Sequence, residues 1–287
     1  MENGGNKMEF IYQVIDMALP FEWLSYTFMK NAFLAIILIT PLFGLLGTMV
    51  VSNRMAFFSD SLGHGAFTGV AIGALLGSIE PLLSIVLFSV LFAGIITYIK
   101  GKSSASTDTI IGVFSSTAIA IGLMLMSYGG SFNKFSSYLI GDLLSISDSD
   151  LVVLFFVFIA VLIVWMIIFN KLLLISINTS LASSRGIHTM AIEMIFAAML
   201  AIVVAISIQW VGLLIINSML VLPAAAARNI TNSVQSYHCI SITFALLSGI
   251  FGLVASYYFN TATGATIVLI SSILFFVTLV MKPYAVK

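Results

Sequence analysis

The sequence predicts an all-α membrane protein, a polytopic transmembrane helical bundle of about nine spans. Of its 287 residues, 61% are hydrophobic and only 8% are charged, whereas a soluble domain carries about 25% charged residues. Long stretches without Asp, Glu, Lys or Arg recur along the chain, and the basic residues are shared unevenly between the loops that separate them. This composition excludes a water-soluble enzyme, a disordered chain and a basic nucleic-acid-binding protein.

Seven uncharged stretches supply the spans in chain order. About 20 apolar residues cross a hydrocarbon core, and lipid offers no partner for a free backbone group, so each span must be a helix. The first five stretches have 19 to 25 residues and cross once each. The last two have 34 and 53 residues, and dividing them near Gln209 and at the turn-like Asn260–Gly264 gives nine spans. The stretches are 31–53, 61–79, 81–99, 109–133, 151–170, 194–227 and 229–281.

The basic residues predict the orientation, because they concentrate in cytoplasmic loops. If the first span starts outside, eight basic residues fall inside and three outside. A single crossing at 194–227 would leave eight spans and put the C-terminal lysines outside, so nine spans agree better with the charges. The inner set is Arg54, Lys100, Lys102, Lys171, Arg185, Arg228, Lys282 and Lys287, and the outer set is Lys7, Lys30 and Lys134.

The same orientation assigns the ends of the chain and its longest loop. Residues 1–27 are expected to form an extracytoplasmic or interfacial segment, 28–282 a single transmembrane domain and 283–287 a short cytoplasmic tail. The longest inner loop is 171–189, where a Ser or Thr at the start and Gly186 at the stop permit a short surface helix. A loop of this length with its own helix is more often functional than a plain connector.

The second span carries two stripes at helical spacing. Asp60, His64 and Thr68 recur every fourth residue, which places a carboxylate, an imidazole and a hydroxyl on one face. Glycines recur every fourth residue on another face, where they form a ridge without side chains that lets a neighbouring backbone approach. The glycines are Gly65, Gly69, Gly73 and Gly77.

The acid and the imidazole are the candidate metal ligands. An Asp in the middle of a transmembrane helix costs about 2.5–3.5 kcal/mol, so it is expected to face a cavity, a partner or an ion. Carboxylate oxygen with imidazole nitrogen suits Zn²⁺, Mn²⁺ or Fe²⁺. Thr68 and Met219 are further candidates for the same path. A structural alternative stays open, in which Asp60 caps the helix start near Arg54 and His64 bonds a carbonyl group.

The sequence shows no means of hydrolysing ATP. Gly101-Lys102-Ser103 resembles the end of a phosphate-binding loop, but the glycine that this loop needs five residues earlier is Ile96. Neither a His-Glu-x-x-His pair nor a nucleophile elbow is present. We therefore expect no catalytic residues and no permanently bound cofactor.

Four motifs follow one another along the chain. They are Asp60-Ser-Leu-Gly-His64 with the glycine-spaced helix, the segment from Ser136 to Ser147, the Ala182-Ser-Ser-Arg-Gly186 loop, and the stretch from Val211-Gly212 through Leu222-Pro223-Ala224 to Arg228. Together they resemble the ABC-3 family, the permease subunits of bacterial zinc, manganese and iron importers, and the resemblance covers about residues 30–282.

The resemblance implies a fold similar to the type II, vitamin B12-type ABC importers, in a bacterial inner or plasma membrane. It implies a homodimeric core with two cytoplasmic ATPase subunits that use ATP, supplied by an extracytoplasmic metal-binding protein. The loop at about 173–188, with Ala182, Arg185 and Gly186, would dock into the ATPase. Asp60 and His64 would lie on the route of the transported divalent ion.

Three rival functions remain. A permease for a metal chelate, a siderophore or a cobalamin-like substrate would have a wide path that does not need Asp60 or His64. A secondary transporter would work without ATP, but proton relays usually use chains of mid-membrane Asp, Glu or His residues, which are scarce here. A membrane enzyme would need a nucleophile–base or metal constellation, and the sequence shows none.

Overall fold

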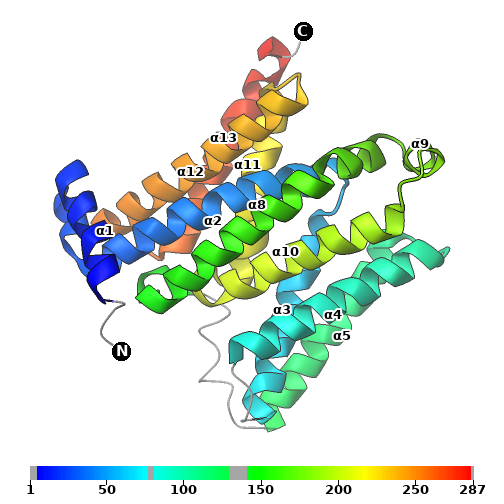
Figure 1. Cartoon of the computed structure of the whole chain (residues 1–287), viewed down its shortest axis with the longest axis horizontal. Helices are drawn as coiled ribbons and strands as arrows, with labels where there is room; N and C mark the ends of the chain where they lie inside the picture. Colours follow the sequence, from blue (N-terminus) through cyan, green and yellow to red (C-terminus); the bar gives the residue numbers. More distant parts are fainter. Residues whose placement is uncertain (1–4, 77–80, 129–140, 286–287) are drawn as a thin grey trace.

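The computed structural model describes residues 5–76, 81–128 and 141–285, and within these ranges it is helical without β-strands (Figure 1). This confirms the predicted all-α class. The elements are α1 Gly5–Ala18, η1 Glu22–Ser25, α2 Thr27–Ser52, α3 Ala56–Leu76, α4 Pro81–Lys102, α5 Thr107–Tyr128, η2 Leu143–Ser145, α8 Asp148–Ile177, α9 Thr179–Ser184, α10 Thr189–Val211, α11 Leu213–Ile230, α12 Val234–Phe259 and α13 Thr263–Ala285.

Each of the nine predicted segments corresponds to one long helix in the described part of the chain. Seven of these helices are long and apolar enough to cross a membrane: α2, α4, α5, α8, α10, α12 and α13. The other two are α3, which carries Asp60, His64 and four described glycines, and α11, which has only 18 residues. Both pack inside the bundle, α3 between α4, α5 and α10, and α11 between α2, α12 and α13.

Helix α2 forms the centre of one half of the bundle. It packs against α8, α11 and α12, and Phe43, Leu46 and Val50 on it are fully buried. In Figure 1 the helices α3, α4 and α5 form the other half, and α10 lies between α8 and α4. The halves meet where α10 packs against α4 and α3, and where α3 contacts α11. The face of α3 that carries the candidate ligands is therefore held in place by helices from both halves.

The two long uncharged stretches are interrupted by residues with positive φ. Gly212 has φ +88° and separates α10 from α11. The break lies three residues after Gln209, because glycine tolerates this backbone conformation at no steric cost. Asn260 has φ +52° and ends α12, at the start of the predicted turn. Each stretch is thus divided into two helices as predicted, with the first division displaced by three residues, although α11 is too short to count among the seven candidate spans.

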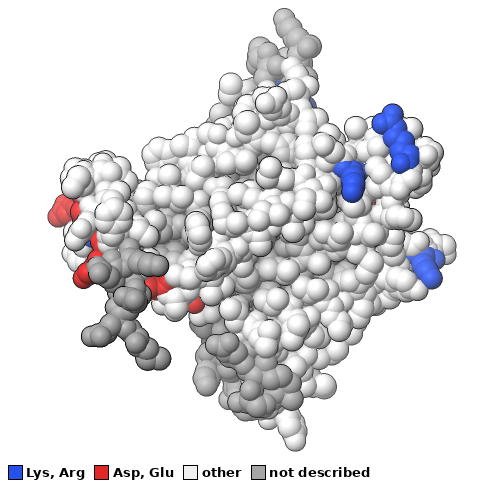
Figure 2. All heavy atoms as spheres, viewed as in Figure 1, with Lys and Arg blue, Asp and Glu red and all other residues white. Residues whose placement is uncertain are grey.

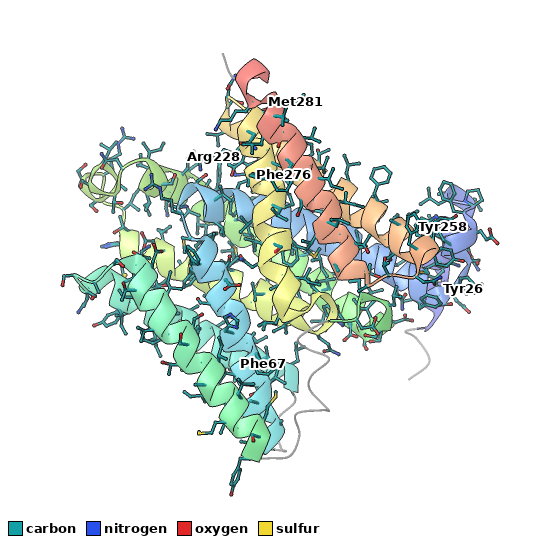
Figure 3. The ribbon with its side chains drawn as sticks, turned by 180° about the vertical axis from the view of Figure 1, so that it is seen from behind. Tyr26, Phe67, Arg228, Tyr258, Phe276 and Met281 are labelled. Atoms are coloured by element: carbon teal, nitrogen blue, oxygen red, sulfur yellow. The ribbon has the colours of Figure 1, made fainter. Side chains whose placement is uncertain are left out.

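Charged side chains gather at opposite ends of the helices. On the face shown in Figure 2, acidic side chains cluster at the α1 end and basic side chains at the α9 end. Figure 3 shows Tyr26 and Tyr258 together at the first end, and Arg228 and Met281 toward the other. Exposed tyrosines at the helix ends are typical of a membrane interface. The predicted outer residue Lys134 and the inner Lys287 lie outside the described residues.

Candidate functional site

The turn between α2 and α3 fixes where the candidate ligands begin. The Asn53 side chain donates a hydrogen bond to the Met49 carbonyl oxygen at 2.8 Å, and Arg54 adopts a left-handed conformation with φ +56°. Helix α3 then starts at Ala56, and Asp60 lies just beyond its first turn. The Ser59 hydroxyl, one residue earlier, donates to the Ala56 carbonyl oxygen at 2.8 Å.

Asp60 and His64 lie side by side on one face of α3. His64 Nε2 is 3.6 Å from Asp60 Oδ2. The His64 side chain is 23% exposed and the Asp60 side chain is 48% exposed. Two ligands held at about 2.1 Å by one tetrahedral ion are about 3.4 Å apart, so the observed separation needs little change to bind a shared ion. The described residues of this protomer leave the pair accessible on a helix that is otherwise mostly buried.

The face of α3 next to the pair is closed by α11. The Ser59 hydroxyl donates to Asn217 Oδ1 at 2.5 Å, and a side chain at Gly63 would meet Leu213 at 3.1 Å. Asn217 was not among the residues predicted from the sequence. Its amide contacts α3 at Ser59, the residue directly before Asp60. A polar residue inside an apolar helix would have been the signal that reveals it.

The glycine ridge packs against α4. A Cβ atom at Gly65 would lie 2.6 Å from the Phe92 ring, and one at Gly69 would lie 2.9 Å from the Ile85 Cα atom. The Ser84 hydroxyl also donates to the Gly69 carbonyl oxygen at 3.0 Å. Gly73 is buried, whereas Gly77 lies outside the described residues. The ridge therefore lets α3 and α4 approach backbone to backbone and directs the ligand pair to another side.

Thr68 does not share the accessible surface of the pair. Its side chain is fully buried against α5, where its hydroxyl donates to the Ala118 carbonyl oxygen at 2.6 Å. The same hydroxyl lies 3.1 Å from the backbone carbonyl oxygen of His64. Met219 on α11 is also buried and lines a small apolar pocket with Trp210 and Leu143. That pocket includes neither Asp60 nor His64.

The predicted coupling segment contains a short helix, α9. Asn178 caps it, because its side-chain oxygen accepts a hydrogen bond from the Leu181 backbone at 3.0 Å. Ala182 is fully buried and Arg185 is exposed. Gly186 ends the segment with φ +76°, and no other atom lies within 4 Å of the position that a Cβ atom would take there. Helix α9 lies at the end of the bundle, where it contacts α8 and α10 through its buried side and leaves Arg185 exposed beside it (Figure 1).

Within the described ranges, no group of three or more His, Cys, Asp or Glu residues is close enough to hold a metal ion. One protomer therefore offers two ligands at α3. A tetrahedral or octahedral ion needs further ligands, which a second copy of the chain, water or a backbone group would supply.

Comparison with known proteins places the chain among metal-uptake membrane proteins. Residues 25–282 match the model of the ABC 3 transport family. The manganese import system permease protein ScaB of Streptococcus gordonii is 32% identical over 259 residues, which are 90% of this chain and 93% of the relative. The high-affinity zinc uptake system membrane protein ZnuB of Buchnera aphidicola is 30% identical over 251 residues, which are 87% and 96%.

A solved structure has the same fold. PsaBC from Streptococcus pneumoniae, determined in complex with Fab, superposes with a TM-score of 0.79 at 31% identity. The superposition covers 88% of this chain and 91% of the other. The segment before residue 25, which includes α1, lies outside the family match.

Proposed function

Since the chain belongs to the ABC 3 transport family, we propose that it is the membrane-spanning permease subunit of an ATP-driven importer of divalent transition-metal ions. It is a multi-pass bacterial membrane protein. Relatives named for zinc uptake and for manganese import are about equally similar, so either ion is a candidate substrate, together with Fe²⁺.

One observation carries the proposal: an acid and an imidazole lie 3.6 Å apart and partly exposed on a helix in the membrane bundle. An uncompensated carboxylate in this position is costly, and a passing dication offsets that cost. Two copies related by a two-fold axis would present two such pairs to one ion, giving four ligands of the kind that Zn²⁺ and Mn²⁺ accept. Hence Asp60 and His64 are the proposed metal ligands.

The partners follow from the two ends of the bundle. The segment 1–27 and the outer loops would receive an extracytoplasmic metal-binding protein. The segment 173–188, with α9 projecting from it, would dock into a cytoplasmic ATPase, and Ala182, Arg185 and Gly186 would shape that contact. The chain contributes no ATPase site of its own, so the energy for transport comes from ATP bound by the partner.

Transport requires release as well as capture. Two ligands per protomer, partly exposed, favour transient binding over a permanent site. Nucleotide-driven movement of α9 would shift the population between outward- and inward-facing states. The close approach of α3 to α4 along Gly65 and Gly69 would let α3 move with α4 as one body.

The test replaces Asp60 with Asn and His64 with Gln, separately, and measures uptake of radioactive Zn²⁺ and Mn²⁺ at equal expression. Loss of a ligand should lower uptake by about 10–100-fold or more, since even an outer-shell partner of a metal ligand has an effect of that size. Asp108→Asn, an exposed acid at the start of α5, is the matched control and should keep normal uptake.

Full uptake in both ligand variants would show that Asp60 and His64 do not bind the transported ion. The same assay separates an ion from a chelate: excess free Zn²⁺ or Mn²⁺ should compete with the labelled ion, and a siderophore or cobalamin should not. Competition by the siderophore or cobalamin alone would show that the substrate is a chelate and not a free ion.

A further inference from the structure

A polar cavity of about 450 Å³ lies where several helix ends meet on the predicted cytoplasmic side, away from the α3 pair. It is bounded by the α2–α3 turn and by the ends of α4, α8, α10 and α11. Arg54, Lys100 and Arg228 line it, and each comes from a different element. All three belong to the basic residues that the charge distribution places inside.

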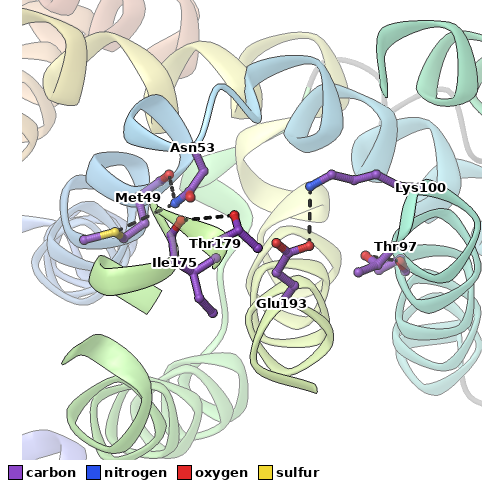
Figure 4. Close-up of polar contacts among 8 residues, drawn as sticks. Met49, Asn53, Thr97, Lys100, Ile175, Thr179 and Glu193 are labelled. Carbon is purple, nitrogen blue, oxygen red and sulfur yellow. Dashed lines mark hydrogen bonds and ion pairs between the residues drawn. The ribbon is translucent and has the colours of Figure 1, made fainter. Parts of the chain in front are cut away.

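The cavity carries more positive than negative charge. Glu193 is the one acid among the described residues that line it, and it pairs with Lys100, whose Nζ atom lies 3.4 Å from Glu193 Oε2 (Figure 4). Among the described residues, neither Arg54 nor Arg228 forms an ion pair with a carboxylate. Two guanidinium groups therefore remain uncompensated at the same cavity. Such a site repels a divalent cation and attracts an anion.

The backbone holds one of these arginines in place. Arg54 has a left-handed conformation, and its N–H donates to the Val51 carbonyl oxygen at 3.2 Å, while Met55 N–H bonds the Val50 carbonyl oxygen at 2.8 Å. Glycine would adopt this turn more easily. Arg228 is held nearby, since its side chain donates to the same Val51 carbonyl at 3.4 Å. The contact at Val51 brings the Arg228 guanidinium next to the backbone of the turn that carries Arg54, and both residues line the cavity.

We propose that this cavity binds a phosphate group, and that the source is the headgroup of an anionic phospholipid from the cytoplasmic leaflet. Guanidinium groups bind phosphate oxygens in a bidentate manner. Ser176 and Thr179 also line the cavity, and their hydroxyls donate to the Leu173 and Ile175 carbonyl oxygens of α8. Basic pockets between transmembrane helices on the cytoplasmic side are a recognised setting for anionic headgroups. A bound headgroup would link α2, α8, α10 and α11 next to α9.

The experiment uses the purified full-length chain in detergent. Native mass spectrometry measures retention of dioleoylphosphatidylglycerol against dioleoylphosphatidylcholine, and inorganic phosphate and pyrophosphate are added as competitors. The double variant Arg54→Gln/Arg228→Gln should weaken binding of phosphatidylglycerol by about 25-fold, at about five-fold for each charge removed. Lys102→Gln/Lys282→Gln removes two charges from the same end without touching the cavity, and should leave binding unchanged.

A second variant separates charge from damage to the fold. Glu193→Gln removes the acid that lines the cavity and should tighten binding about five-fold, whereas a misfolded site would bind less. Retention of phosphatidylglycerol that phosphate does not displace supports the lipid source. If pyrophosphate binds and the two lipids are retained equally, the headgroup is not the source of the phosphate, and the site is assigned to soluble phosphates. Equal retention of both lipids with no phosphate binding, or weaker binding in Glu193→Gln, overturns the anion site.

Discussion

At the scale of single residues, glycines set how closely the helices approach. A Cβ atom at Gly47 of α2 would overlap the Leu220 carbonyl oxygen of α11, which no side chain allows. A Cβ atom at Gly44, one turn earlier, would lie 2.8 Å from the Ile242 Cα atom of α12. Gly141, with φ +75°, lies against the α10–α11 break, where its Cβ would overlap the Gly212 backbone nitrogen. Each contact is between backbones, so a flexible side chain cannot yield.

Gly47→Ala should therefore lower stability by about 1–3 kcal/mol, because α2 and α11 must separate. Thermal unfolding of the purified chain in one detergent measures the change. Gly112→Ala on α5 is the control: no atom lies within 4 Å of its Cβ, and alanine favours the helix by up to about 1 kcal/mol. Equal melting temperatures for both variants would contradict the packing described for α2 and α11.

At the scale of elements, α1 is attached to the bundle by polar contacts. The Tyr12 hydroxyl lies 2.5 Å from Asn31 Oδ1 on α2 and 2.7 Å from Asp148 Oδ1 on α8. Lys30 pairs with Asp16 at 2.6 Å. The outward side of α1 carries Phe10 and Met17, which are 67% and 87% exposed. These apolar side chains fit the interfacial location expected for residues 1–27.

Tyr12→Phe should loosen α1, since it removes the hydroxyl that joins α1 to α2 and α8. The loss is about 1 kcal/mol, the usual size for one hydrogen bond. Hydrogen exchange of residues 5–18 should become faster, while Tyr128→Phe, at a side chain that is 89% exposed, should leave it unchanged. Unchanged protection of α1 in Tyr12→Phe would show that apolar contacts alone hold it.

The same contact has a predicted pH dependence. Burial and, next, the Asp148 carboxylate raise the pKa of the Tyr12 phenol above its usual value of 10.0. A raised pKa in the folded state means that the contribution to stability is complete below pH 10, and is lost as pH rises further. Protection of α1 should thus be constant through neutral pH and fall only in strong alkali.

At the scale of the whole molecule, the separation of charges predicts how the bundle sits in the membrane. On the face shown in Figure 2, basic side chains lie at the α9 end and acidic side chains at the α1 end, whereas Glu193 and Lys30 are paired with the opposite charge at each end. The cationic cavity, α9 and the proposed ATPase contact then share the cytoplasmic side. The Asp60–His64 pair lies near the beginning of α3, closer to that side than to the outer one, if α3 runs from inside to outside.

Accessibility of introduced cysteines tests this orientation. The single native thiol is first removed as Cys239→Ser, and Glu22→Cys or Ser184→Cys is then added. A membrane-impermeant maleimide should label Glu22→Cys in intact cells and Ser184→Cys only in inverted vesicles. The parent Cys239→Ser protein is the control and should stay unlabelled. The reverse pattern would invert the bundle and move the cavity and α9 outside.

Much of this architecture can be predicted from the local composition of the sequence. The uncharged stretches predicted the nine long helices, since lipid requires each apolar segment to satisfy its own backbone. Spacing placed Asp60 and His64 one turn apart, because helix geometry alone sets that distance. The four motifs predicted the family, which the match over 25–282 confirms.

Only the tertiary structure decided which neighbours each face meets. Thr68 shares a stripe with His64 but bonds the Ala118 carbonyl of α5, since helical spacing does not say where a neighbouring helix lies. Likewise Lys100 and Glu193, 93 positions apart, meet only because α4 packs on α10. Periodicity in the sequence predicts which residues share one face of a helix. Packing between segments that are distant in the sequence decides whether that face is buried, paired or accessible.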